Sequence, residues 1–188
     1  MKLKHISHLI TGSVMELFGV MADGKVVNSY ELTNKRGAKL KVINYGATVT
    51  SLKMPLKSGE MVDVVLGFDT LENYINSFDL ESAPYLGATV GRYAGRINNA
   101  TFNLNGEIIH LDKNNNGHSL HGGKDNFSKK VWEVKNVNEG CSPSITFSYL
   151  SPANEGNYPG DLSVELTYAL SENNELIIEY IAQTTEDT

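Results

Sequence analysis

The strongest constraint on the fold is a series of short runs in which apolar and polar residues alternate, separated by turn residues. Residues 144–150 (SITFSYL), 162–170 (LSVELTYAL) and 175–182 (ELIIEYIA) show this pattern, and residues 39–52 and 61–68 have the composition of strands. Alternation places successive side chains on opposite faces of a sheet. Many strands at close spacing predict an all-β fold, an antiparallel β-sandwich formed by residues 1–188 as a single domain.

Two local signals add detail to this prediction. The dipeptide Asn-Gly at 105–106 lies between two alternating runs and predicts a two-residue hairpin loop. The resulting register sets Thr101 opposite His110, and His110 is expected to be solvated. Asp69 and Glu72 resemble a capping box, and the apolar spacing after them predicts one short helix over residues 70–76.

Composition excludes several classes of protein. Sixteen basic and 22 acidic residues give a net charge of −6, which argues against a nucleic-acid-binding face. The single cysteine, Cys141, permits no disulfide within the chain and is interpreted as a buried, inert thiol. The N-terminus has no clean signal-peptide core, and no run is long enough to span a membrane. A soluble, cytoplasmic protein is therefore expected.

Two of the five histidines, His118 and His121, lie three residues apart in the loop NNNGHSLHGGKDNF. Metal-binding pairs favour a spacing of four on a helix or two on a strand, and a structural zinc site needs four ligands. Because no third ligand is near, a metal is disfavoured. Proton transfer, sugar binding and loop packing all stay open for His121.

Arg92 and Arg96 lie four residues apart in the glycine-rich stretch PYLGATVGRYAGRI. Either both are solvated at a strand edge, or they form a fork that binds a ligand's oxygens where Gly91 and Gly95 let it approach the backbone. Spacing alone leaves both interpretations open. Tyr158 and Trp132 offer aromatic faces for a sugar-stacking platform, but core packing is the favoured interpretation for a single tryptophan.

Six segments stand in a fixed order along the chain: NYGATVTSLKMP (44–55), VVLGFDTLENY (64–74), PYLGATVGRYAGRI (84–97), FNLNGEIIHL (102–111), SLHGGKDNFSKKVW (119–132) and SPANEGNYPGDL (151–162). Together they resemble the aldose 1-epimerase family, the galactose mutarotases, from about residue 28 to residue 183. The resemblance implies the family's fold, a galactose mutarotase-like antiparallel supersandwich.

The resemblance also implies an activity: interconversion of the α and β anomers of free hexoses such as galactose and glucose, without a metal or organic cofactor. In the family, a glutamate removes the proton of the anomeric hydroxyl and a histidine protonates the ring oxygen. The ring opens and closes again as the other anomer. This is paired general acid–base catalysis, and a histidine suits the acid role because its unperturbed pKa is about 6.5.

Matched residue by residue, Arg96 corresponds to the family's sugar-binding arginine. His121 corresponds to the histidine of its SLHGG motif, which lies against the sugar and assists the proton network. Gly95 stands where the family usually has asparagine, so any contact from that side chain is absent. His118 matches no family role and is expected to be a loop residue. The resemblance thus implies Arg96, His121 and Gly95 as substrate-binding residues.

Family chains are far longer than 188 residues. Their acid histidine is expected soon after Thr188 and their base glutamate near the far C-terminus, so this chain is expected to be an N-terminal half without the principal pair. The alternative is a truncated, non-catalytic remnant or carbohydrate-binding domain of the family. A metal-dependent cupin-like protein is disfavoured because a second histidine pair and a glutamate are missing.

Loss of the later strands would expose apolar edges in residues 42–49 (VINYGATV) and 175–182 (ELIIEYIA). The missing half, or a second copy of the chain, is expected to cover them. Otherwise the chain closes a smaller sandwich from its own strands.

Overall fold

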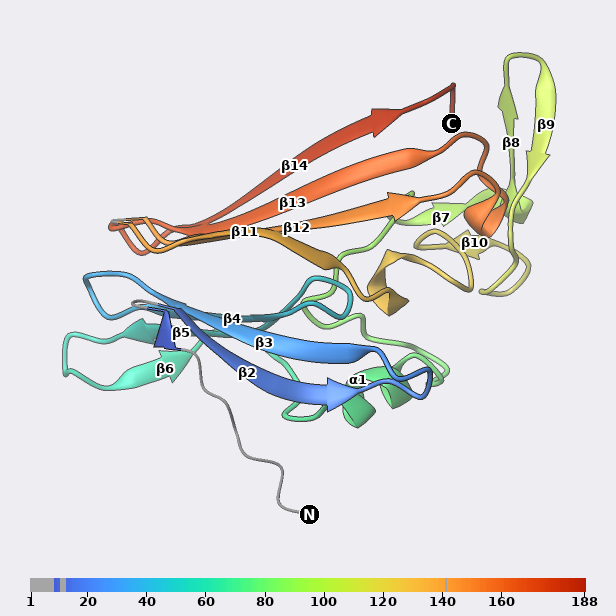
Figure 1. The fold of residues 1–188 in the computed structure, drawn as a ribbon. Helices are drawn as coiled ribbons and strands as arrows, with labels where there is room; N and C mark the ends of the chain where they lie inside the picture. The colour runs from blue at the N-terminus through green and yellow to red at the C-terminus, as the bar shows by residue number, and fades with distance from the viewer. Residues whose placement is uncertain (1–8, 11–12, 141) are drawn as a thin grey trace.

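Two antiparallel sheets lie face to face in the structure, a computed structural model that describes residues 9–10, 13–140 and 142–188 (Figure 1). Cys141 and its predicted burial lie outside the described residues. The first sheet has the order β1-β2-β3-β4-β5-β6, and the second has the order β11-β12-β13-β14. Their strands are β1 (Leu9–Ile10), β2 (Ser13–Val20), β3 (Val26–Thr33), β4 (Lys39–Ile43), β5 (Thr48–Pro55), β6 (Met61–Asp63), β11 (Glu133–Asn138), β12 (Ser144–Ser151), β13 (Leu162–Leu170) and β14 (Leu176–Thr184).

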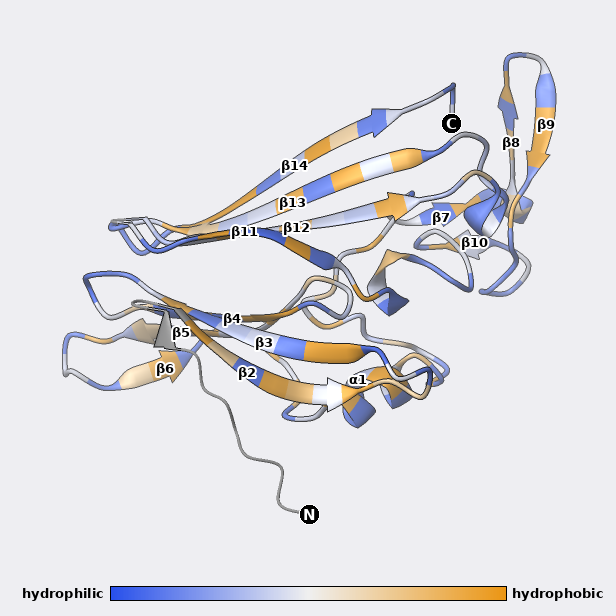
Figure 2. Ribbon diagram, viewed as in Figure 1, coloured by the Kyte–Doolittle hydropathy of each residue, from blue (hydrophilic) through white to orange (hydrophobic). Residues whose placement is uncertain are grey.

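The main core fills the space between these sheets. Leu40 and Val42 of β4 and Phe147 and Leu166 of the second sheet are fully buried in one apolar cluster. Burial of a side chain of this size contributes about 1.5–3 kcal/mol each. Figure 2 shows hydrophobic and hydrophilic residues alternating along β13, as a strand with one face in a core requires. The predicted all-β antiparallel sandwich is confirmed.

The two apolar runs expected at exposed edges have different outcomes. The expected exposure of residues 42–49 is wrong: Val42, Ile43 and Val49 are at most 7% exposed. The second sheet covers one face of this segment and α1 (Leu71–Ser77) packs against the other. The exposure expected for residues 175–182 is confirmed, because β14 is the last strand of its sheet and its apolar side chains are about half exposed.

The helix α1 lies on the outer face of the first sheet (Figure 1). Its N-cap is Thr70, whose side-chain oxygen accepts a hydrogen bond from the Asn73 N–H at 3.2 Å. The predicted cap, Asp69, is wrong by one residue. A capping oxygen accepts from an N–H two or three positions further along, and here Thr70, not Asp69, accepts from Asn73. Within the described part of the chain, no helix is long and apolar enough to cross a membrane.

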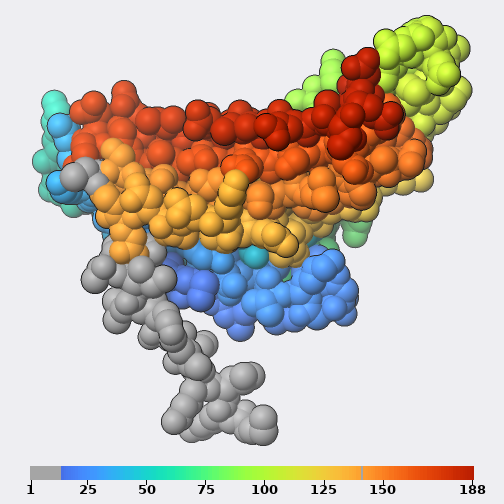
Figure 3. All heavy atoms as spheres, turned by 45° about the horizontal axis from the view of Figure 1, so that its top comes forward, coloured from blue at the N-terminus to red at the C-terminus, as the bar shows by residue number. Residues whose placement is uncertain are grey.

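The hairpin predicted at Asn105-Gly106 is present as β8 (Thr101–Leu104) and β9 (Glu107–His110). Its register sets Thr101 opposite His110, as predicted, and His110 is exposed. Asn105 and Gly106 have φ values of +53° and +90°, the left-handed conformations that a type I′ loop needs. The hairpin projects from one end of the molecule (Figures 1 and 3).

Four strands of the two sheets, β1, β2, β3 and β11, were not predicted, and one was predicted too long. The run at 61–68 forms a strand only as far as Asp63. The Asp63 carboxylate accepts the backbone N–H groups of Leu52 and Val65 at 3.0 and 3.1 Å. A side chain that takes over backbone donors in this way ends the ladder, whatever the composition of the residues that follow.

Candidate sugar site

His121 lies in the loop after β10 (Ser119–Leu120), and this loop is tied to the residue before β7 (Arg96–Ile97). The two short strands pair with Leu120 opposite Arg96. The His121 N–H donates to the Gly95 carbonyl at 2.9 Å, and the Gly95 N–H donates to His121 Nδ1 at 3.1 Å. We call this reciprocal pair the His121–Gly95 clasp. It fixes both the backbone and the ring of His121.

The clasp decides which nitrogen of the neutral ring carries the proton. Because Nδ1 accepts a hydrogen bond, the neutral ring must carry its proton on Nε2. Burial lowers the pKa of His121 below its usual 6.5, and the nearby positive charge of Arg96 lowers it further. The Tyr85 ring stands edge-on to the imidazole, with ring centroids 4.8 Å apart. The neutral ring is thus held in one orientation as an Nε2–H donor.

The Arg96 side chain forms one hydrogen bond, and the N–H groups of its two terminal nitrogens stay available to a ligand. Its Nε donates to Asn115 Oδ1 at 3.0 Å, and no acceptor among the described residues bonds its two terminal nitrogens. Asn114 fastens the loop on both sides of His121, since its amide donates to the carbonyls of Leu120 and Gly123 and its oxygen accepts the Leu120 N–H. A guanidinium with free donors suits oxygen-rich ligands.

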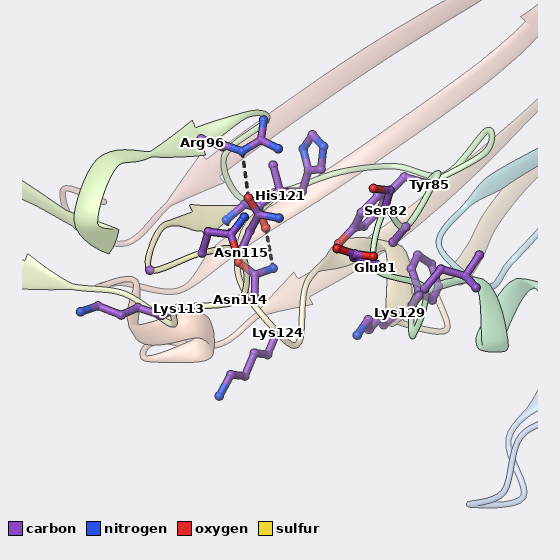
Figure 4. Close-up of a pocket in the computed structure, with 16 residues that line it drawn as sticks. Glu81, Ser82, Tyr85, Arg96, Lys113, Asn114, Asn115, His121, Lys124 and Lys129 are labelled. Carbon is purple, nitrogen blue, oxygen red and sulfur yellow. Dashed lines mark hydrogen bonds between the residues drawn. The ribbon is translucent and has the colours of Figure 1, made fainter.

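Arg96 and His121 border one cavity of about 570 Å³ (Figure 4). This volume is within the range of small-molecule sites. Its walls include Tyr85, Asn114 and Asn115. Gly95 supports the site from behind through the clasp. Its φ is +100°, and a Cβ added there would meet only the edge of the Tyr93 ring at 4.0 Å. The structure therefore brings two predicted residues to one cavity and the third against one of them.

Gly122 sets how closely the loop approaches the chain behind it. Its φ is +89°, and a Cβ added there would lie 1.8 Å from the Gly91 carbonyl oxygen. Only glycine fits such an approach in this conformation. The residue that follows His121 is thereby packed against backbone.

Arg92 does not share the cavity with Arg96, so the fork interpretation is wrong. Its guanidinium donates to the Ser151 side chain and to the carbonyls of Ser151, Pro152 and Pro159, all at 2.9–3.0 Å. The alternative of two solvated arginines is wrong for Arg92 as well. Arg92 fastens the loop after β12 to the segment before β7, a structural task.

His118 is a loop residue, as expected. Its backbone forms a bridge with Asn115, and its Nδ1 accepts the Asn99 N–H at 3.1 Å. The Nδ1 lone pairs of both His118 and His121 are thus used by backbone donors. Across residues 9–10, 13–140 and 142–188, no three His, Cys, Asp or Glu side chains gather in a group that could hold a metal.

Trp132 and Tyr158 are core residues rather than a platform for a sugar. Trp132 is 1% exposed and donates from Nε1 to the Phe127 carbonyl, and Tyr158 is 5% exposed. Sequence reasoning missed Tyr85, Asn114 and Asn115, which shape the cavity. The asparagine run at 114–116 was visible as a loop, but only the fold shows which side chains bind backbone and which hold Arg96.

Comparison with known proteins identifies relatives of this chain. Residues 28–188 match the family model described as aldose 1-epimerase. The chain is 41% identical over 150 residues to the galactose mutarotase of Bos taurus and 38% identical over 173 residues to that of Homo sapiens. These alignments cover 80% and 92% of this chain, but 41% and 47% of the relatives. The chain thus spans about half the length of the curated relatives it matches.

Solved structures agree with this relationship. An aldose epimerase homologue from C. elegans superposes with a TM-score of 0.72 at 36% identity, over 82% of this chain and 45% of that one. The galactose 1-epimerase of Lactobacillus acidophilus superposes with a TM-score of 0.77 at 26% identity, over 92% of this chain and 48% of that one. The family model, the relatives and the shared fold lead to one conclusion: the chain belongs to the aldose 1-epimerase family.

Proposed function

We propose that this chain supplies the sugar-contacting part of an aldose 1-epimerase, which interconverts the α and β anomers of free aldohexoses such as galactose and glucose. The observation that carries the proposal is the cavity where the clasped His121 lies beside the free donors of Arg96. Family membership names the reaction class, the relatives' names supply galactose, and glucose comes from the family resemblance of the sequence.

Each site residue has a distinct role in this proposal. Arg96 donates hydrogen bonds to sugar hydroxyl oxygens, since a guanidinium has donors and no acceptor. His121 donates from Nε2–H to a sugar oxygen and helps move the proton exchanged during ring opening. Gly95 keeps the imidazole in the tautomer that leaves Nε2 as the donor. No metal or organic cofactor is needed for these steps.

The principal acid and base belong, in this proposal, to the part of the relatives' length that this chain does not span. General acid–base groups contribute roughly 10²- to 10⁴-fold each. The chain alone is therefore expected to show little or no mutarotase activity, with at most a trace from His121.

Polarimetry with freshly dissolved α-D-galactose and α-D-glucose tests the proposal. Adding a polypeptide that carries the remaining family length is expected to restore anomer exchange. His121→Asn should reduce the restored rate and His118→Gln should leave it unchanged. A rate from the chain alone that matches a full-length relative would show that it supplies its own acid–base pair. Sugar binding without exchange in the mixture would favour a non-catalytic carbohydrate-binding domain.

We also propose that the exposed apolar side chains of β14 are covered by the remaining family length or by a second copy of the chain. An unpaired edge with apolar faces is a template for another strand. The cytoplasmic location expected from the sequence stays a prediction.

A further inference from the structure

The cavity that holds Arg96 and His121 is far more positive than the chain around it. Four cationic side chains line it, Arg96, Lys113, Lys124 and Lys129, and only one carboxylate, Glu81. The whole chain has the opposite balance, with 22 acidic and 16 basic residues. A concave surface lined by charges of one sign focuses their electrostatic field and raises the local concentration of oppositely charged ligands.

The lysines of this cavity are not neutralised by the protein. Lys113, Lys124 and Lys129 form no ion pair with any residue that the structure describes, whereas the neighbouring Lys130 binds both Asp125 and Glu155. Lys129 rests its ammonium over the Phe78 ring, 5.4 Å from the centroid, which holds it in place and leaves its charge available. The positive charges of these three lysines are therefore not balanced by carboxylates of the described residues, unlike the charge of Lys130.

The positions of the cations fit a ligand with two ends. Figure 4 shows Lys124 and Lys129 apart from Arg96 and His121, and the ends of both Lys113 and Lys124 are directed away from His121. A neutral hexose needs only hydroxyl partners, which Arg96, His121 and the asparagine amides provide. The ammonium groups of Lys124 and Lys129, at a distance from His121, are not needed to bind a neutral hexose.

We propose that this cavity accepts a hexose bearing an anionic group, a phosphate ester or a carboxylate, at the end of the sugar remote from its anomeric carbon. The anomeric end lies at His121 and Arg96, and Lys124 and Lys129 bind the anion. This rests on the proposed function, because it uses the same cavity for the same class of sugar. Lysine ammonium groups are common phosphate ligands.

The test compares the binding of four ligands to the purified chain: galactose, glucose 6-phosphate, galacturonate and inorganic phosphate. Backbone N–H signals of residues around the cavity report binding in an NMR titration. At low salt, the anionic sugars are expected to bind about tenfold more tightly than galactose, as two weakly screened ion pairs allow. This advantage should shrink in high salt. The two anionic sugars distinguish a phosphate from a carboxylate as the preferred group.

Variants locate the effect. The double variant Lys124→Gln/Lys129→Gln should lose the preference for anionic sugars and still bind galactose, which also shows that it folds. The charge-matched control Lys53→Gln/Lys57→Gln, with one lysine in β5 and the other in the loop between β5 and β6, should keep the preference. Glu81→Gln should strengthen the binding of anionic sugars, because it removes the one opposing carboxylate.

The outcomes separate this inference from the proposed function. Equal binding of galactose and the anionic sugars would overturn the inference and leave the sugar site intact. Inorganic phosphate that binds as tightly as glucose 6-phosphate would show an anion site without sugar recognition and would also overturn it. Absence of binding by every sugar would contradict both.

Discussion

At the scale of single residues, the protonation state of His121 is decided by its neighbours. Burial and Arg96 lower its pKa below 6.5, so the folded chain keeps the ring neutral where the unfolded chain binds a proton. The free energy of unfolding should therefore fall as the pH drops from above 6.5 through the lowered pKa. His121→Asn should flatten this dependence because it removes the titrating ring. Asparagine is chosen because it tolerates the φ of +52° at this position.

Urea unfolding at a series of pH values measures this effect, and an NMR titration of the His121 ring in the folded chain gives its pKa directly. The same titration in urea supplies the unfolded reference. A folded-state pKa equal to or above that reference would contradict the electrostatic account of the clasp.

Arg92 stabilises the chain through geometry that only an arginine provides. Its planar fork reaches carbonyls of three residues and the Ser151 hydroxyl, and a lysine cannot reproduce this set. Arg92→Lys should lower the free energy of unfolding by about 2–3 kcal/mol. The control is Arg36→Lys at an exposed turn, expected to change it by less than about 0.5 kcal/mol. Similar values for both substitutions in chemical denaturation would refute the structural role of Arg92.

At the scale of elements, the loop between β10 and η2 (Phe127–Lys129) depends on one close approach. Gly122→Ala places a Cβ against the Gly91 carbonyl in a left-handed conformation. Gly117→Ala, in the turn before β10, has a similar φ of +84° but open space around the new Cβ. Both substitutions carry the conformational cost of roughly 1–3 kcal/mol, and only Gly122→Ala adds the clash.

Denaturation of the two variants therefore isolates the clash. Gly122→Ala should be the less stable variant and should also displace the NMR signals of His121. Equal destabilisation by both substitutions would mean that the loop relaxes without disturbing the site.

The elements that could be predicted from the sequence are those that local rules determine. The β8–β9 hairpin follows from its two turn residues, and β13 from nine residues of regular alternation. β2 was not predicted because a register shift between Leu17 and Gly19 interrupts its alternation. β3 was not predicted because two consecutive residues, Ser29 and Tyr30, are both buried, which also breaks the alternation. The positions of the site residues could not be predicted from local rules, because they depend on contacts between distant parts of the chain. The β7–β10 pairing brings Arg96 next to His121, and hydrogen bonds to carbonyls about 60 residues away hold Arg92 outside the cavity.

At the scale of the whole molecule, β14 is an edge strand with exposed apolar side chains on both of its faces. Its Ile178 and Tyr180 lie opposite the buried Tyr168 and Leu166, so they continue the face that forms the core, yet they are 48% and 55% exposed. Ile177 and Ile181 on the other face are exposed to a similar degree. Apolar side chains on both faces of an edge strand favour association with another strand.

Without another polypeptide, the chain is therefore expected to self-associate through β14. Light scattering combined with intact mass should give particles above 20.6 kDa that grow with concentration. The double variant Ile178→Lys/Ile181→Lys should restore the monomer, because it places a charge on each face. Leu66→Lys, at a site 77% exposed outside β14, should not. A wild-type monomer of 20.6 kDa at every concentration would show that the strands of this chain form a self-sufficient sandwich.

In this proposal, the cavity beside the His121–Gly95 clasp binds an aldohexose. Titrating the chain with galactose, while following the NMR signals of the Gly95 N–H, the His121 ring and the Arg96 Nε–H, measures this binding directly. These signals should shift together and saturably, the His110 ring on the projecting hairpin should not respond, and His121→Asn should weaken the binding. If saturating galactose leaves the clasp unchanged, or shifts His110 to the same extent, the assignment of the site is wrong.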